Sequence, residues 1–240
     1  MFTHIKHEIV RPFVKEEHTE NGHYYRTDKG DLYPSITTLF KLLDPKDWYP
    51  HWVNSIAKKM NITEAEAEIE CKRIGEASMK VGTALHLLAE CHLKNLGDQC
   101  VNEVEKYDKD PNELFKPLKE HLDEHINNIH AIEAKLYHDE MRLAGTVDLI
   151  AEYDGVLSVI DFKNSRKPKM PSDIKKSHYN EQVTAYAQMW EFCTKQKIEQ
   201  GVILVISWDV KVRPFKVNIQ DYISSLWDTL INYQTTEALK

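Results

Sequence analysis

The segment AGTVDLIAEYDGVLSVIDFK, residues 144–163, constrains the fold of this chain more than any other. At its centre Asp154-Gly155, a dipeptide preferred in two-residue hairpin turns, stands between two runs of strand-forming apolar residues. Such a turn sets the register of two antiparallel strands. Counting outward from it places Asp148 opposite Asp161, with Lys163 two residues further along the second strand.

The predicted register brings two carboxylates and one ammonium group together inside apolar strands. Side chains two residues apart share a face of a strand, and directly opposed residues have Cβ atoms about 4.5–5.5 Å apart. Two like charges at that distance repel, and a divalent cation with a preference for oxygen ligands, Mg²⁺ or Mn²⁺, would remove the repulsion. The alternative is that Lys163 neutralises one aspartate while the other points into solvent.

The pattern along the rest of the chain predicts an α/β protein with one mixed β-sheet flanked by helices. A small hairpin over 23–37 is followed by a helical region over 46–96 and a helix from Pro111 to about Asn128. The later part contains three strands, a helix, two strands and a last helix. The strands are expected over 131–138, 144–153, 156–162, 201–208 and 212–219, and the helices over 178–193 and 219–236.

The composition is that of a globular protein that is large enough for a sizeable core. The 240 residues are 42% hydrophobic and 29% charged, which fits a single domain. There is no apolar run of the roughly 20 residues needed to span a bilayer, and the first 20 residues lack the pattern of a signal or transit peptide, so we expect a cytoplasmic protein without membrane association. The four cysteines show no C-x-x-C spacing, which favours reduced thiols.

The spacing of Asp148 and Asp161-Phe162-Lys163 resembles the active-site motif of the PD-(D/E)XK nuclease superfamily. The proline of that motif is absent, and the G-x-x-D form beginning at Gly145 resembles the RecB-type exonuclease branch and its mitochondrial and phage relatives. The resemblance implies a restriction-endonuclease-like sheet core over 131–240, preceded by a hairpin and helical layer over 1–130. It also implies that the Phe162 backbone carbonyl is a metal ligand beside the two aspartates.

The helical segment VGTALHLLAE, residues 81–90, carries Gly82, His86 and Glu90 on one face. In RecB-type nucleases a helix of this pattern brings a histidine to the metal. The resemblance therefore implies that His86 is a metal ligand and that Glu90 orients it. The alternative for His86 is an ordinary half-buried histidine.

The segment HYNEQVTAYAQMW, residues 178–190, contains Gln182 and Tyr186 in the Q-x-x-x-Y spacing of a further RecB-type motif. By this resemblance Gln182 contacts either the substrate phosphate or the catalytic lysine, Lys163. Tyr186 belongs equally to an apolar stripe that packs the helix. Its role in chemistry and its role in packing are both open at this point.

The formal net charge of -7 argues against unspecific nucleic-acid binding by the whole molecule. Residues 163–176, however, contain one acid and six basic residues, namely Lys163, Arg166, Lys167, Lys169, Lys175 and Lys176. A basic stretch next to the site is able to follow a phosphate backbone, and a solvated loop is the plainer interpretation. Trp48 and Trp52 are candidates for base stacking, although a core position is favoured for both.

Together these features predict a metal-dependent DNA exonuclease that uses Mg²⁺ or Mn²⁺ and acts on free ends of single-stranded DNA. The expected setting is DNA processing, replication or recombination, with a recombination or replication protein as a further partner. Two alternatives stay open: a structure-specific endonuclease on the same fold, and a catalytically idle nucleic-acid-binding domain. Retention of two aspartates and a lysine argues against the idle domain.

Overall fold

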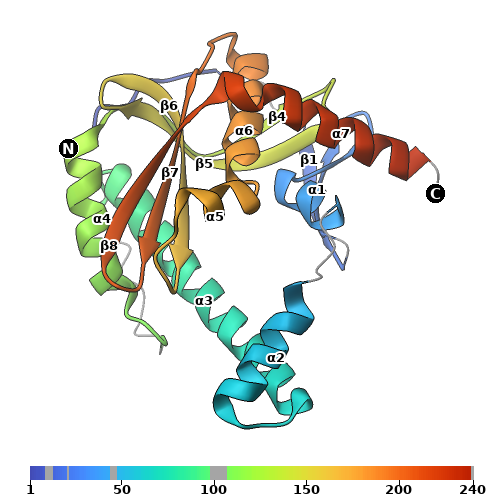
Figure 1. Cartoon of the computed structure of the whole chain (residues 1–240). Helices are drawn as coiled ribbons and strands as arrows, with labels where there is room; N and C mark the ends of the chain where they lie inside the picture. Colours follow the sequence, from blue (N-terminus) through green and yellow to red (C-terminus); the bar gives the residue numbers. More distant parts are fainter. Residues whose placement is uncertain (9–12, 21, 44–47, 98–106, 239–240) are drawn as a thin grey trace.

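A computed structural model describes residues 1–8, 13–20, 22–43, 48–97 and 107–238 of the chain (Figure 1). Its strands are β1 (Phe13–Thr19), β2 (Gly22–Thr27), β3 (Leu32–Pro34), β4 (Ile126–His138), β5 (Leu143–Tyr153), β6 (Val156–Ser165), β7 (Gln200–Ser207) and β8 (Lys211–Asn218). Its helices are α1 (Ile36–Leu43), α2 (Trp48–Met60), α3 (Glu64–Leu93), α4 (Pro111–His125), α5 (Pro171–Lys176), α6 (Tyr179–Thr194) and α7 (Ile223–Ala238), with a 3-10 turn at Ile219–Tyr222.

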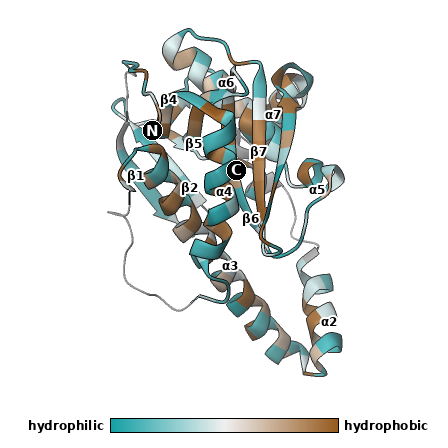
Figure 2. Cartoon of the chain, turned by 90° about the vertical axis from the view of Figure 1, so that its left-hand side faces the viewer, coloured by the Kyte–Doolittle hydropathy of each residue, from teal (hydrophilic) through white to brown (hydrophobic). Residues whose placement is uncertain are grey.

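The central sheet has the strand order β4-β5-β6-β7-β8. All its neighbouring strands are antiparallel except β6 and β7, which run parallel, so the prediction of a mixed sheet flanked by helices is confirmed. Strand β7 is buried on both faces and is drawn largely in the brown of hydrophobic residues (Figure 2). A continuous apolar run is what a strand between two helical layers requires.

Helices cover both faces of this sheet. Residues of α6, α1 and α7 form one core with Val159 and Ile203 of the sheet. On the opposite face α3 and α4 pack against Ile160 and Leu204. The N-terminal helices are therefore divided between the two faces, and do not form one separate layer as expected. Helix α2 and the start of α3 extend beyond the sheet as an arm (Figure 1).

The turn between β5 and β6 forms at Asp154-Gly155, as predicted. Both residues have positive φ, 53° and 78°, which a two-residue type I′ turn requires and which Gly adopts without a Cβ clash. Pairing runs from Tyr153 with Val156 to Leu149 with Ile160. The predicted register is confirmed over that length.

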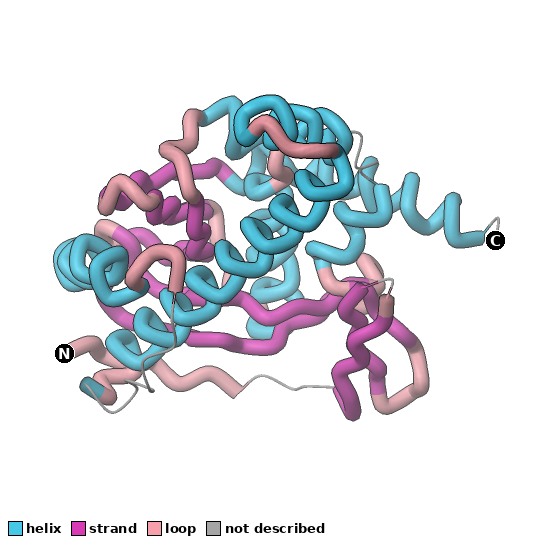
Figure 3. The backbone as a smooth tube through the Cα atoms, turned by 90° about the horizontal axis from the view of Figure 1, so that it is seen from below, coloured by secondary structure: helices cyan, strands magenta, loops and turns pink. Residues whose placement is uncertain are grey.

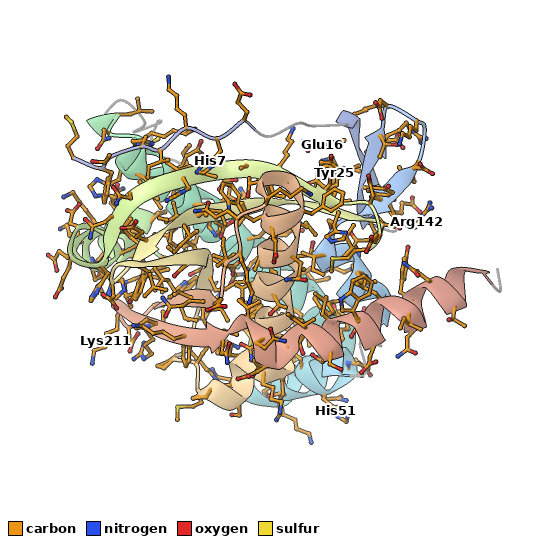
Figure 4. The ribbon with its side chains drawn as sticks, turned by 90° about the horizontal axis from the view of Figure 1, so that it is seen from above. His7, Glu16, Tyr25, His51, Arg142 and Lys211 are labelled. Atoms are coloured by element: carbon orange, nitrogen blue, oxygen red, sulfur yellow. The ribbon has the colours of Figure 1, made fainter. Side chains whose placement is uncertain are left out.

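A second, three-stranded sheet, β1-β2-β3, lies beside the first residues of β5, where Ser35 forms a bridge with Ala144. Its β2–β3 hairpin was predicted, whereas β1 was not. Tyr25 and Glu16 project from it toward the large sheet (Figure 4), where the Tyr25 hydroxyl lies 3.2 Å from Thr146 Oγ1 and Glu16 forms an ion pair with Lys135. The N-terminal segment runs along β4 and is joined to it by a parallel bridge between His4 and Ile129 (Figure 3).

Two further expectations concern the whole chain. Among the described helices, none combines the length and the apolar character of a membrane span. Cys71 and Cys193 are free thiols, but Cys91 is disulfide-bonded, so the expectation of reduced thiols is wrong for Cys91. Sequence spacing alone does not reveal disulfide pairing, because the partner is chosen by the fold.

Candidate active site

The two strands of the hairpin separate where the predicted site begins. Backbone pairing of β5 with β6 ends at Leu149 and Ile160, while β6 continues alongside β7. Beyond this point the Phe162 N–H donates to Oδ2 of Asp148 at 2.7 Å, so a side chain takes the place of the backbone partner. The predicted backbone pairing of Asp148 with Asp161 is therefore wrong. The two residues nevertheless lie on adjacent strands at one opening of the sheet.

Asp161 is the most buried acid of the site, with 2% of its surface exposed. Its Oδ2 lies 2.5 Å from Lys163 Nζ, and the ammonium group lies 5.0 Å from the ring centre of Tyr179. Burial raises the pKa of Asp161, although the Lys163 charge opposes this shift. Burial alone would lower the pKa of Lys163, but the charges of Asp161 and Asp148 outweigh it and raise that pKa.

This arrangement decides between the two readings of the aspartate pair. Lys163 does neutralise one aspartate, Asp161. The other does not point freely into solvent, because the Asp148 side chain is 14% exposed and binds the backbone of β6. Asp148 thus keeps an acceptor oxygen, Oδ1, on the side that faces helix α3.

Helix α3 brings His86 to this opening. Its Nε2 lies 3.1 Å from the Phe162 carbonyl oxygen, and its Nδ1 lies 3.6 Å from Asp148 Oδ1. The partners of the ring are therefore two of the expected metal ligands, Asp148 on β5 and the Phe162 carbonyl on β6. Glu90 forms an ion pair with Lys94 one turn further on, so the expectation that Glu90 orients His86 is wrong. Both ring nitrogens already have other partners.

Asn164 joins α3 to the sheet next to His86. Its Nδ2 donates to the Ser78 carbonyl at 2.9 Å, and its Oδ1 accepts from Trp208 Nε1 at 2.9 Å. A Cβ on Gly82 would lie 3.7 Å from Asn164 Cβ, which is ordinary contact. The helix thus passes close to β6 with room for a Cβ at Gly82, and the asparagine holds the helix there.

Sequence reasoning missed one acid of the site, Glu133. Ile132 pairs with Leu149 and Ala134 with Val147, so Glu133 stands opposite Asp148 on β4. Donor atoms of His86, Glu133 and Asp148 all lie within 4.8 Å of one another. Burial, with the Asp148 charge second, raises the pKa of Glu133 to about 7. The signal was present in the sequence, since Glu133 is an acid within a strand-like apolar run, as Asp148 is.

Gln182 and Tyr186 lie on α6 and cover the same opening. Both are buried, and Gln182 hydrogen-bonds the Tyr186 phenol. Burial, followed by the charges of Asp148 and Asp161, raises the pKa of Tyr186 well above its ordinary value. A Cβ at Gly145 would meet the Tyr186 ring at 2.9 Å, so the glycine of the G-x-x-D motif makes room for this tyrosine. Tyr186 therefore packs against β5, where the charges of Asp148 and Asp161 act on its phenol.

The donor set fits a hard divalent cation. The carboxylates of Glu133 and Asp148 converge with the imidazole of His86, which also contacts the Phe162 carbonyl. Asp161, paired with Lys163, is not part of that group of donor atoms within 4.8 Å. Clustered like charges also give the protein a reason to hold a cation here.

The sequence model of the PD-(D/E)XK nuclease superfamily matches residues 61–223, which include His86, Asp148, Asp161 and Lys163. The chain belongs to the PD-(D/E)XK nuclease superfamily. This confirms the superfamily that the motif spacing suggested, and Asp161-Phe162-Lys163 lies within the matched residues.

Two curated relatives are exonucleases. Over 50 residues the chain is 40% identical to mitochondrial genome maintenance exonuclease 1 of Mus musculus and 38% identical to that of Homo sapiens. The match spans 21% of this chain but only 15% and 14% of those proteins. A solved structure titled "Crystal structure of SSO0001" aligns with 76% of this chain and 70% of its own at 18% identity, but its TM-score of 0.33 is too low to support an argument.

Part of the basic stretch beside this site is engaged in contacts within the protein. Arg166 stacks on Trp208, 4.2 Å from the ring centre, and lies 3.7 Å from a carboxylate oxygen of Asp108. Lys167 is exposed and Lys169 is half-buried in the segment between β6 and α5. Lys167 and Lys169 are therefore better placed than Arg166 to meet a nucleic acid.

The tryptophan candidates for base stacking lie on helix α2. Trp52 is partly buried against Val53, Ala67 and Cys71, so the core reading favoured for it holds. The side chain of Trp48 lies outside the described part of the chain.

Proposed function

We propose that this chain is a metal-dependent deoxyribonuclease that degrades single-stranded DNA from free ends. One observation carries the proposal: Asp148, Asp161 and Lys163 converge with His86 at the opening where β5 and β6 separate. Membership of a nuclease superfamily and partial identity to exonucleases support the reaction type. The proposed setting is DNA processing, replication or recombination in a cytoplasm, alongside a recombination or replication protein.

Each side chain has a part in the proposed reaction. Asp148, Asp161, His86 and the Phe162 carbonyl would hold Mg²⁺ or Mn²⁺, which supplies a Lewis acid and lowers the pKa of a bound water. Lys163, held beside Asp161, positions the attacking water and offsets the negative charge that develops on the phosphate.

Helix α6 completes the proposed site. Tyr186 stays protonated because its pKa is raised, so it retains its hydroxyl hydrogen as a donor, and Gln182 holds the phenol in place. Lys167 and Lys169 would contact backbone phosphates, which carry no base identity, so little sequence preference is expected.

The test compares linear single-stranded DNA with the same sequence ligated into a circle, at low salt with Mg²⁺ and separately with Mn²⁺. The linear form should be degraded to short products, whereas the circle should survive. Labels at the 5′ and 3′ ends of the linear form report the direction of digestion.

Equal degradation of linear and circular DNA would replace the exonuclease proposal with the endonuclease alternative. Binding of both forms without cleavage, at every concentration of either metal, would favour the idle binding domain. A duplex of the same length serves as a further substrate, because the proposal predicts slower degradation of paired strands.

A further inference from the structure

Three carboxylates stand in one row across neighbouring strands of the central sheet. Glu133 belongs to β4, Asp148 to β5 and Asp161 to β6, and these strands are adjacent in that order. The β4–β5 register places Glu133 opposite Asp148, and Asp161 lies on β6, on the other side of β5, just beyond the point where β5–β6 pairing ends. Asp161 has Lys163 as its counter-ion. The other two acids of the row have no such ammonium partner among the described residues.

The backbone at Glu133 indicates a functional constraint. Its φ is 48°, in the left-handed region that residues other than glycine rarely adopt, and it lies in the middle of a strand. Non-glycine residues held in this region are strained and cluster at functional sites. The conformation persists here while the side chain forms no hydrogen bond or ion pair with the described residues.

The surroundings of Glu133 supply no obvious structural role for its charge. Lys94, a cation whose charge reaches Glu133, is ion-paired with Glu90. The groups that do approach the Glu133 carboxylate are the imidazole of His86 and the carboxylate of Asp148, with donor atoms within 4.8 Å. These are ligand types for a divalent cation, and not partners that would stabilise an isolated carboxylate.

We propose that Glu133 is a further ligand of the divalent cation, together with His86 and Asp148, and that β4 therefore contributes to the active site. The inference rests on the proposed function, in which this cation serves phosphodiester hydrolysis. It gives the metal a ligand on each of three adjacent strands as well as one on α3. The strained backbone at Glu133 directs its carboxylate to that position.

The test measures Mn²⁺ affinity by calorimetry or by electron paramagnetic resonance, without DNA. Glu133→Gln and His86→Ala should each weaken Mn²⁺ binding about tenfold or more, the size of effect seen when a metal site loses a supporting group. Glu152→Gln is the matched control, since it removes the same charge from the adjacent strand β5, where Glu152 accepts from Asn128. Its Mn²⁺ affinity should equal that of the wild type.

A second variant separates the loss of a ligand from a failure to fold. Glu133→Gly removes the carboxylate at a residue whose φ of 48° suits glycine, so the fold should be retained or stabilised. This variant should show an undiminished melting temperature without metal, but a smaller rise in melting temperature on addition of Mn²⁺.

The possible outcomes test the ligand role of Glu133 and the proposed nuclease function separately. Wild-type protein that binds Mn²⁺ and cleaves DNA, with unchanged Mn²⁺ affinity in both folded Glu133 variants, overturns the ligand role of Glu133 alone. Wild-type protein that binds Mn²⁺ through Glu133 but cleaves no DNA overturns the proposed function and keeps the ligand. Absence of Mn²⁺ binding by the wild type overturns both.

Discussion

Among single residues, Asp161 is the one whose replacement should separate folding from catalysis. Asp161→Asn keeps the size of the side chain in a position that is 2% exposed, while it removes the charge that holds Lys163. We expect cleavage to be abolished, with the fold intact and DNA binding largely retained. Nuclease assay, thermal melting and gel shift on the same preparation check this, with the exposed Asp228→Asn on α7 as control. Full activity of a folded Asp161→Asn protein would remove Asp161 from the site.

Gly145 offers a prediction about packing. A Cβ at this position would lie 2.9 Å from a ring carbon of Tyr186, so Gly145→Ala should destabilise the protein by about 1–3 kcal/mol, as overpacking does. Gly75→Ala is the matched control, because no atom lies within 4 Å of the Cβ that it would add. Alanine in a helix interior is favoured over glycine by about 0.5–1 kcal/mol. Urea unfolding of both variants measures the change in the free energy of unfolding, which should be negative for Gly145→Ala and positive for Gly75→Ala. Equal changes in the two variants would contradict the close approach of Tyr186 to Gly145.

Between elements, α4 is joined to β5 by a pH-sensitive contact. His121 Nε2 lies 2.9 Å from the Tyr153 hydroxyl, and burial, with the His125 charge second, lowers the pKa of His121 to about 4 from 6.5. The unfolded chain binds a proton at His121 below about pH 6.5, but the folded chain resists it until about pH 4. Burial of His121 therefore opposes its protonation, so the folded state loses stability as pH falls through that window.

The contact gives a prediction for His121→Gln. Its melting temperature relative to wild type should rise as pH falls from 6.5 to 4. The change should amount to several degrees, at about 2–4 °C for each kcal/mol in a chain of this size. Thermal melts across this range check it, with His51→Gln as control because His51 is exposed on α2 (Figure 4). A pH-independent difference would mean that His121 contributes only through packing.

For the whole molecule, the question is how a chain with a net charge of -7 approaches DNA. The proposed answer is a local one: Lys167 and Lys169 border the active-site strand, and electrostatic binding to phosphates depends on such near charges more than on the total. Replacing both lysines by alanine should weaken binding to single-stranded DNA similarly for all sequences. The slope of log affinity against log salt should fall by about 0.7 for each lost phosphate contact.

Filter binding on catalytically inactive Asp161→Asn protein, over a range of salt concentrations, checks this prediction. Lys116→Ala with Lys119→Ala on α4 is the matched control, because it removes the same charge from exposed positions on another element. An equal loss of slope in both pairs would show that overall charge, and not the segment after β6, controls the approach of DNA.

Much of the candidate site was predictable because its geometry is local. The Asp154-Gly155 turn determines the register of adjacent strands, and helical spacing determines which face of α3 carries His86. Glu133 was not predicted, because its position opposite Asp148 depends on the pairing of β4 with β5. The residues between these two strands contain no recognisable turn sequence from which the register could be counted. Glu90 was assigned to His86 from helical spacing and the resemblance to RecB-type nucleases, whereas in the structure Glu90 forms an ion pair with Lys94.

The β5–β6 hairpin, most of the strands and helices, and the family to which the chain belongs were predictable from residues near one another along the chain. The point at which the hairpin opens depends on the tertiary structure. Strand β6 leaves β5 after Ile160 and stays with β7, a strand that follows about 40 residues later. That choice depends on two apolar cores, one on each face of the sheet, which form between segments distant in sequence. The opening between Asp148 and Asp161 follows from it.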